Sequence, residues 1–212
     1  MRSASDLDAV TIDSFGTLLL LEDPIRPLQA ALAERGVERD PDRVRAAFHA
    51  EAAFYRPRSL AGRDAAGLAD LRRECVGVFL TELEAELHAA SFVDAFLGAI
   101  SFRLADGVEE ALTALAAAGL SLACVANWDT SLDEHLLRAG IHDRFAVVVA
   151  SAAVGFEKPD PRIFRVALER LGAEPGRALH IGDEDVDRLG AAAAGMAFEP
   201  VPLATLPARL GL

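Results

Sequence analysis

The chain has 212 residues, of which 52% are hydrophobic, and a formal net charge of -12. This length supports one large core or two modest ones, and the composition is typical of a folded protein. The acidic balance disfavours nucleic acid and membranes as partners, because the chain has no surplus of cationic side chains to neutralise phosphates. The apolar run Leu18 to Leu21 is far too short to cross a bilayer. We therefore expect a cytoplasmic protein that acts on a small molecule.

The first strand is predicted over residues 9–12, where Ala, Val, Thr and Ile form a short, continuous and partly β-branched run. Asp13 follows directly and leads into Ser-Phe-Gly-Thr, in which Gly16 favours a turn. Open α/β sheets place their reactive groups at the carboxyl ends of strands. Asp13 is therefore a candidate catalytic carboxylate, although an Asp in this position is often only a turn residue.

Helical periodicity replaces strand patterns after this motif. We predict helices over residues 25–35, 41–55, 64–88 and 91–100, the second of them opened by Asp40-Pro41. Residues 22–102 are thus expected to form a helical cap, and residues 1–21 and 103–212 a catalytic core. Within the cap, Tyr55 and Arg56 are candidates for contact with an anionic substrate, although an Arg near a helix end is commonly a surface residue.

Strands and helices alternate after the insertion. A helix is predicted over residues 107–118, and strands over residues 120–125 and 178–181. Such alternation implies right-handed crossovers and a parallel sheet. The expected fold class is α/β, with a Rossmann-like, doubly wound parallel sheet and a helical cap inserted after the first strand.

Polar side chains follow each of these strands or the loops next to them. Asn127 follows the strand at 120–125, Lys158 lies in a Gly-Phe-Glu-Lys-Pro loop, and Asp183 and Asp187 follow the strand at 178–181. Because parallel strands end at one edge of a sheet, we expect these groups to meet Asp13 there. One lysine among several carboxylates suits a cation-requiring phosphoryl or acyl transfer. The alternative is that the two aspartates and Asn127 only cap helices.

The ordered motifs D-x-x-G-T, a strand ending before Asn, K-P-D-P and G-D-x-x-x-D resemble those of the haloacid dehalogenase superfamily, in its branch with a helical cap. The resemblance runs along nearly the whole chain. Residues 112–196 look especially similar to a subgroup of hydrolases whose second motif reads S-N-W-D or S-N-F-D; here that motif is Ala-Asn-Trp-Asp.

This resemblance implies a role for each matching residue. Asp13 would be the nucleophile, and Lys158 would offset negative charge on Asp13 and on the transferred group. Thr17 and Asn127 would hold substrate oxygens. The implied cofactor is Mg²⁺, with four candidate ligands: Asp13, the main-chain carbonyl of Phe15, Asp183, and Asp187 either directly or through water.

Two positions depart from the phosphatase pattern of this superfamily. Phe15 stands where an aspartate usually protonates the leaving group, and Ala126 stands where a Ser or Thr usually contacts the phosphoryl group. The candidates for a replacement acid are His180 and a residue of the cap. The single tryptophan, Trp128, is expected either to line the substrate cleft or to fill the core.

Three functions are compatible with these departures. One is a slow or restricted magnesium-dependent phosphohydrolase that acts through an aspartyl-phosphate on a small phosphorylated metabolite. Another is a haloacid dehalogenase-like hydrolase, which an aromatic Phe15 favours and the acidic Gly182-Asp183 motif disfavours. The last is a catalytically weak or inactive protein that binds a metabolite or another protein. Whether the chain is a monomer or a homodimer stays open.

Overall fold

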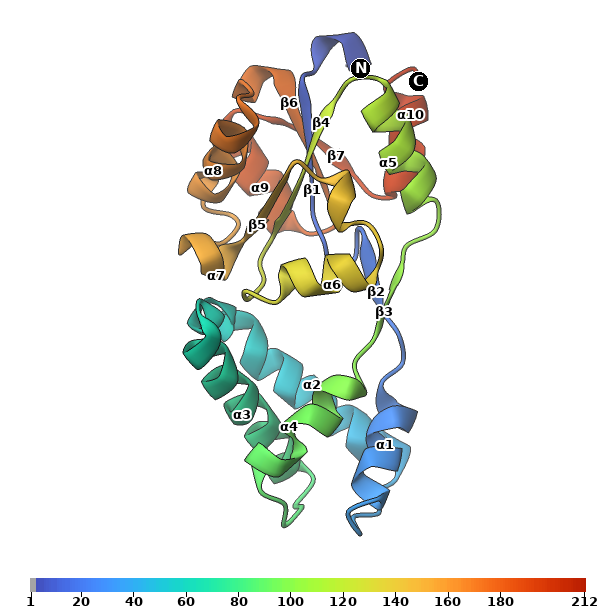
Figure 1. Cartoon of the computed structure of the whole chain (residues 1–212), viewed down its shortest axis with the longest axis vertical. Coiled ribbons are helices and arrows are strands. Elements are labelled where there is room, and N and C mark those ends of the chain that lie inside the picture. The colour runs from blue at the N-terminus through green and yellow to red at the C-terminus, as the bar shows by residue number, and fades with distance from the viewer. Residues whose placement is uncertain (1–2) are drawn as a thin grey trace. The chain divides into compact units, whose positions relative to one another are not determined.

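The computed structural model describes residues 3–212, which divide into two compact units (Figure 1). One unit combines Met1–Leu20 with Arg103–Leu212, and the other is Leu21–Phe102. The first contains a five-stranded parallel sheet in the order β5-β4-β1-β6-β7, which confirms the predicted α/β class. Its strands are β1 (Ala9–Ile12), β4 (Ser121–Ala126), β5 (Val147–Ala150), β6 (Ala178–Gly182) and β7 (Ala197–Pro200).

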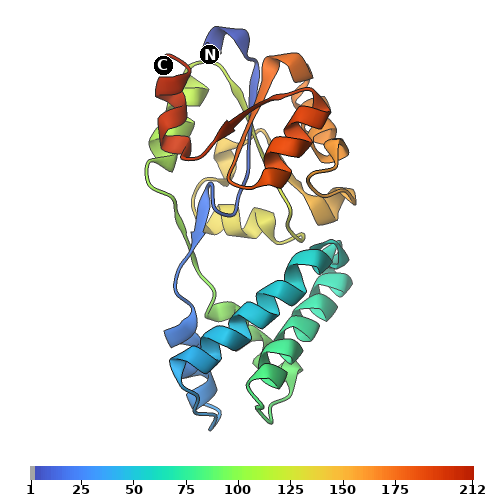
Figure 2. The ribbon, with the colours of Figure 1, turned by 180° about the vertical axis from the view of Figure 1, so that it is seen from behind.

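Helices cover both faces of this sheet (Figures 1 and 2). Helices α8 and α9 lie on one side of it, and α5 and α10 on the other. The α8–α9 side is packed by buried residues such as Phe164 and Ile163 of α8 and Ala191 of α9. The helices are α5 (Val108–Ala117), α6 (Leu132–Arg138), α7 (Ser151–Val154), α8 (Pro161–Leu171), α9 (Asp185–Ala194) and α10 (Leu206–Arg209); short 3-10 turns are Ala4–Asp6, His142–Arg144, Pro175–Arg177 and Leu203–Thr205.

The strand order reverses between β1 and β6. From β1 the chain continues to β4 and β5 on one side, and then returns to β6 and β7 on the other. In doubly wound sheets, ligands bind outside the carboxyl ends of the strands at such a switch point. Asp13 follows β1 and Asp183 follows β6, so both side chains leave the sheet at this point, and the amide of Asp13 still donates to the carbonyl of Ile181 at 2.9 Å.

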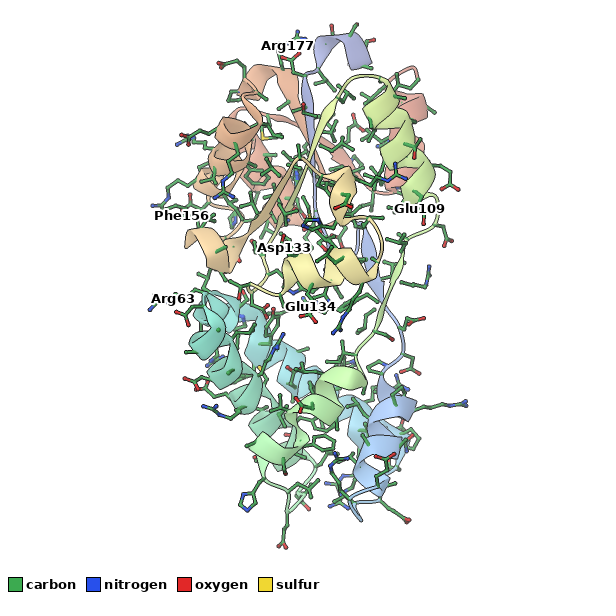
Figure 3. The ribbon with its side chains drawn as sticks, viewed as in Figure 1. Arg63, Glu109, Asp133, Glu134, Phe156 and Arg177 are labelled. Carbon is green, nitrogen blue, oxygen red and sulfur yellow. The ribbon has the colours of Figure 1, made fainter. Side chains whose placement is uncertain are left out.

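The opposite ends of β1 and β6 are also joined. Arg177, which precedes β6, donates to the carboxylate of Asp8 through Nε at 2.6 Å and through Nη2 at 2.7 Å (Figure 3). The amide of Asp8 in turn donates to the carbonyl of Arg177 at 2.8 Å. Both strands therefore start in register, with Ala9 opposite Ala178, and this register places their carboxyl ends side by side.

The inserted unit is helical and has its own core. It comprises α1 (Ile25–Ala33), α2 (Pro41–Tyr55), α3 (Ala65–Glu82) and α4 (Ala89–Gly98), with the 3-10 segment η2 (Arg56–Gly62) after α2. The Asp40 side chain caps α2 by accepting from two amides of its first turn, as the sequence Asp-Pro predicts. In the centre of this unit, Phe79 lies 6.2 Å from Phe92 and 5.0 Å from Phe96, ring centre to ring centre.

The elements with predicted ranges agree with the structure within two residues, with one exception. The helix predicted over residues 64–88 ends at Glu82, because Glu84 adopts a left-handed conformation with φ 50° that no right-handed helix continues. In addition, four strands had no predicted range: β5, β7, and β2 (Leu19–Leu21), which pairs with β3 (Phe102–Leu104). Within residues 3–212, no helix is both long and apolar enough to span a membrane.

Candidate active site

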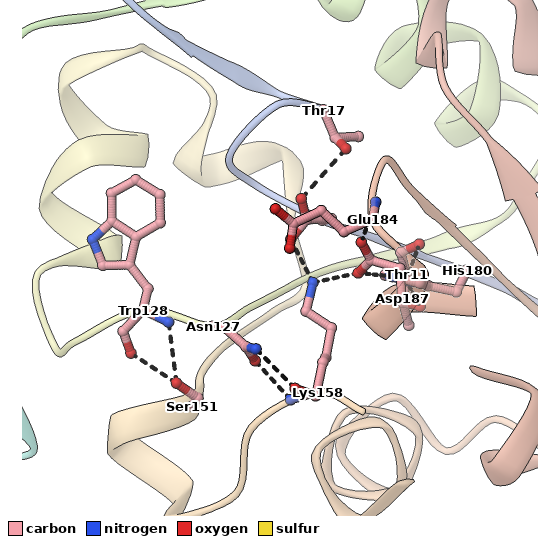
Figure 4. A network of polar contacts seen from close by, with 10 residues as sticks. Thr11, Thr17, Asn127, Trp128, Ser151, Lys158, His180, Glu184 and Asp187 are labelled. Atoms are coloured by element: carbon pink, nitrogen blue, oxygen red, sulfur yellow. Dashed lines mark hydrogen bonds and ion pairs between the residues drawn. The ribbon is translucent and has the colours of Figure 1, made fainter. Parts of the chain in front are cut away.

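Asp13 occupies the turn that follows β1, and its side chain is almost entirely enclosed. Its Oδ1 accepts a hydrogen bond from Nζ of Lys158 at 2.5 Å, and its Oδ2 lies 3.4 Å from the hydroxyl of Thr17 (Figure 4). Gly16 closes the turn with φ 83°, which favours glycine. A Cβ at this position would lie 2.2 Å from Oδ2 of Asp183, so any larger residue would displace that carboxylate.

Lys158 is the only lysine of the sequence, and only 4% of it is exposed. Its backbone is fixed by the side chain of Asn127, whose Oδ1 accepts from the Lys158 amide at 2.7 Å and whose Nδ2 donates to the Lys158 carbonyl at 3.0 Å. The helix that follows Asn127 has Ser131 as its N-cap, so the predicted capping role of Asn127 is wrong. Contact between Asn127 and a substrate stays a prediction.

Three carboxylates meet at this edge of the sheet. One oxygen from each of Asp13, Asp183 and Asp187 lies within 4.8 Å of the others. With the ammonium of Lys158, these ionised groups carry a formal charge of -2, since three carboxylates face one cation. An all-oxygen donor set with this charge fits a hard divalent cation such as Mg²⁺. Asp187 also accepts from the amide of Glu184 at 3.1 Å, so it caps α9 as well.

Burial and the neighbouring charges shift the pKa values of these groups. Burial raises the pKa of Asp13 to about 6, although Lys158 opposes this shift. Burial also acts to raise the pKa of Asp187, but hydrogen bonds from His180 and Lys158 lower it to about 2. Burial acts to lower the pKa of Lys158, yet Asp13 and Asp187 raise it, so the ammonium stays charged. Burial and the charge of Asp187 raise the pKa of Asp183.

His180 contributes to this network from inside the sheet. Its Nε2 lies 2.9 Å from Oδ1 of Asp187, and its Nδ1 lies 2.8 Å from the hydroxyl of Thr11 (Figure 4). The ring is fully buried, and burial lowers its pKa. Since both nitrogens are directed at these neighbours, the idea that His180 replaces the missing acid is wrong. The sequence signal for a structural role was only a histidine within an apolar strand.

The two departures from the phosphatase pattern lie at the tips of β1 and β4. Phe15 is 39% exposed, and its ring centre is 6.4 Å from that of Trp128. Trp128 itself is buried, and its amide donates to the hydroxyl of Ser151 at 3.1 Å. Trp128 thus mainly fills the core beside Phe15. Ala126 ends β4 and offers no side-chain donor.

Tyr55 and Arg56 belong to the inserted unit, where Tyr55 ends α2 and Arg56 begins η2. Their contact with a substrate therefore stays a prediction. Likewise, the roles of Thr17 toward substrate and of the Phe15 carbonyl toward a metal stay predictions that rest on the resemblance of the motifs.

Comparison with known proteins agrees with this geometry. The mouse (Mus musculus) haloacid dehalogenase-like hydrolase domain-containing protein 3 is 41% identical over 102 residues, which are 48% of this chain and 41% of that protein. A glyceraldehyde 3-phosphate phosphatase of Methanothermobacter thermautotrophicus is 52% identical over 64 residues, 30% of this chain and 28% of that protein. The matches thus span less than half of these curated relatives.

Among solved structures, a putative beta-phosphoglucomutase from Thermotoga maritima shares the fold, with a TM-score of 0.74 at 19% identity over 97% of this chain and 99% of that one. A family model described as haloacid dehalogenase-like hydrolase matches residues 7–195. The ordered motifs, the switch-point carboxylates and this match, which covers most of the sequence, place the chain in the haloacid dehalogenase-like hydrolase family.

Proposed function

We propose that this hydrolase is a magnesium-dependent phosphohydrolase that acts through an aspartyl-phosphate on a small phosphorylated metabolite. The observation that carries the proposal is the group of Asp13, Asp183 and Asp187 around a single ammonium, with carboxylate oxygens within 4.8 Å of one another. Such a charge excess opposes an incoming phosphate unless a cation is present. Bound Mg²⁺ supplies that positive charge and polarises the phosphoryl group.

The residues that would hold Mg²⁺ are Asp13, Asp183 and the main-chain carbonyl of Phe15. Asp187 is different, because its two oxygens already accept hydrogen bonds from Lys158, His180 and the amide of Glu184. We therefore assign Asp187 a contact to the ion through water, and not a direct bond.

The proposed reaction has two steps, and Asp13 takes part in both. A carboxylate oxygen of Asp13 forms a bond to phosphorus while the bond from phosphorus to the leaving oxygen breaks, and the leaving group departs with the electron pair. Water then attacks the same phosphorus, which releases phosphate and restores the Asp13 carboxylate, and one water proton passes to solvent. Throughout, Lys158 offsets the charge on Asp13.

Phe15 and Ala126 restrict which substrates can react. A phenyl ring cannot protonate a leaving oxygen, and general acid-base assistance contributes roughly 10²- to 10⁴-fold. An aryl or acyl phosphate has a stable leaving group and hardly needs that proton. The phosphatases among the matched relatives, named for glyceraldehyde 3-phosphate and phosphoglycolate, support a phosphate monoester as substrate.

A substrate panel with and without magnesium tests this function. Aryl and acyl phosphates should react roughly 10²-fold faster than alkyl or sugar phosphates, and a chelator should abolish the reaction. Comparable rates on both classes would mean that another acid serves the leaving group. Halide release from 2-haloacids without magnesium would instead establish a dehalogenase. Magnesium binding without turnover of any ester would favour a binding protein.

A further inference from the structure

A continuous line of polar contacts runs from the interior of the sheet to the candidate nucleophile. It connects the Thr11 hydroxyl with Nδ1 of His180 at 2.8 Å, and Nε2 of His180 with Oδ1 of Asp187 at 2.9 Å. The same Asp187 oxygen accepts from Nζ of Lys158 at 2.5 Å, and Nζ donates to Oδ1 of Asp13, also at 2.5 Å (Figure 4). At most 6% of any of these five residues is exposed.

The hydrogen of the contact between His180 and Asp187 is fixed by elementary chemistry. An ionised carboxylate only accepts hydrogen bonds, so Nε2 of His180 must be the donor. The Thr11 hydroxyl and carbonyl lie 2.8 Å and 3.0 Å from Nδ1. Nε2 is the donor to Asp187 regardless of which of these two groups is hydrogen-bonded to Nδ1. Because Thr11 is in β1 and His180 is in β6, the imidazole orientation is set by the pairing of these two strands.

Asp187 is held on three sides. Oδ1 receives His180 and Lys158, Oδ2 receives the amide of Glu184, and Gly182 leaves room where a Cβ would lie only 2.4 Å from the carboxylate carbon. A lysine side chain is long and flexible, so its ammonium needs fixed acceptors to keep one position. Asp187 is such an acceptor only while its own oxygen is fixed.

We propose that His180 is a positioning residue: by fixing Oδ1 of Asp187, it holds the Lys158 ammonium against Asp13. The part of this inference that concerns catalysis rests on the proposed function, whereas the part that concerns the ammonium does not. The competing explanation is packing, since the imidazole also lies edge-on to Phe164, with 4.8 Å between ring centres, and 6.4 Å from the ring of Phe198.

Two substitutions separate hydrogen bonding from packing. His180→Gln keeps an amide hydrogen near the place of Nε2 but removes the ring. His180→Phe keeps an aromatic ring but has no donor. If His180 positions Asp187, the Gln variant should resemble the wild type; if it only packs, the Phe variant should.

The sole lysine supplies a readout that does not depend on activity. In protein labelled with ¹⁵N-lysine, the only lysine side-chain signal is that of Lys158. A buried ammonium between two carboxylates exchanges slowly with solvent, so this signal should be sharp in the wild type and in His180→Gln, and broadened or lost in His180→Phe. A wild-type signal in folded His180→Phe, or its loss in folded His180→Gln, would overturn the proposal. Should the Phe variant not fold, His180→Leu replaces it, because Leu also lacks a donor.

Turnover of an aryl phosphate provides the second readout. In His180→Phe, kcat should fall about 10-fold or more with little change in KM, as is typical when a residue that orients a ligand is removed. His180→Gln should retain most of the wild-type kcat. Equal kcat in the wild type and His180→Phe would refute the catalytic part. If the wild type turns over no ester, the proposed function fails, while the ammonium signal still decides whether His180 positions Lys158.

Discussion

Lys158 faces two carboxylates at 2.5 Å each, and a third, that of Asp183, lies close by. Removing one member of a buried ion pair usually destabilises a protein strongly, because the remaining charge loses its partner. Here the imbalance is already present, since one cation serves three acids. Burial raises the pKa of Asp13 to about 6, and the charge of Asp187 adds to this shift, although Lys158 opposes it. At the scale of single residues, the site is thus short of positive charge, and a divalent cation would supply it.

The first prediction concerns Asp183→Asn, which removes one charged ligand of the proposed magnesium site. We expect magnesium affinity to fall at least about tenfold, which corresponds to about 1.4 kcal/mol. Calorimetric titration measures this directly. Asp185→Asn serves as the matched control, because Asp185 is an exposed carboxylate in the same turn that pairs with Arg188. Equal affinity in the wild type and Asp183→Asn would remove Asp183 from the metal site.

The second prediction treats the two unusual residues as reversible losses. Phe15→Asp provides an acid that also activates water, so it should act on both formation and hydrolysis of the aspartyl-phosphate and raise turnover by up to roughly 10²-fold. Ala126→Ser adds a single donor and should help less. Steady-state rates on an alkyl phosphate test both changes. A double variant that folds and binds magnesium, yet hydrolyses nothing new, would show that these positions do not limit the site.

At the scale of elements, helix α2 carries an acidic group into the interior of the inserted unit. Glu51 is only 7% exposed, and it forms a hydrogen bond with Cys75 of α3. Burial raises the pKa of Glu51 from 4.5 to about 7. Folding therefore favours the protonated carboxyl of Glu51, and ionisation of this group destabilises the folded state.

The third prediction follows from the raised pKa of Glu51. Between pH 4.5 and about 7 the folded state binds a proton that the unfolded chain has released, so the stabilising contribution of neutral Glu51 is lost as the pH rises through this window. Ionisation should cost up to about 3 kcal/mol. Glu51→Gln cannot ionise, so it should be more stable than the wild type near pH 8 and similar to it near pH 4.

Urea unfolding at these two pH values tests the Glu51 prediction. Tyr55, the only tyrosine of the sequence, lies in the inserted unit and reports on it. Glu74→Gln is the control, because Glu74 is exposed on α3. If the stability difference between Glu51→Gln and the wild type were the same at both pH values, ionisation of Glu51 would play no part.

The chain enters the inserted unit and leaves it at adjacent points. Strands β2 and β3 pair there, the amide of Glu22 donates to the carbonyl of Ser101 at 3.0 Å, and the Ser101 hydroxyl donates to the Glu22 carboxylate at 2.7 Å. An insertion whose ends are joined in this way adds no long open loop to its host. Its own aromatic core, with Phe79 at the centre, stabilises it separately.

The fourth prediction is that the α/β unit folds without the insertion. Replacing residues 23–100 by a short Gly-containing turn should leave β2 and β3 paired as a hairpin. The truncated chain should keep the near-ultraviolet circular dichroism of Trp128, the only tryptophan, and bind magnesium within about threefold of the full chain. Loss of the Trp128 signal would show that the α/β unit depends on the insertion for folding.

Three strands of the core sheet and the polar residues that follow them can be predicted from local sequence signals, and the alternation of strands with helices predicts that the sheet is parallel. Apolar runs such as residues 9–12 are local signals, and parallel strands must end at one edge, so Asp13, Lys158 and Asp183 were predictable as neighbours. The helix predicted over residues 64–88 was too long, because the left-handed conformation of Glu84 has no strong signal in a non-glycine residue.

The partners of the remaining polar groups depend on contacts between residues that are distant in the sequence. Asn127 binds the backbone of a residue 31 positions away, and His180 meets Thr11 across 169 positions. Neither pairing leaves a local pattern, since an Asn after a strand or a His within one has several possible partners of similar energy. The pairing of β1 with β6 selects among them, because it brings Thr11 opposite His180 and so turns the imidazole toward Asp187.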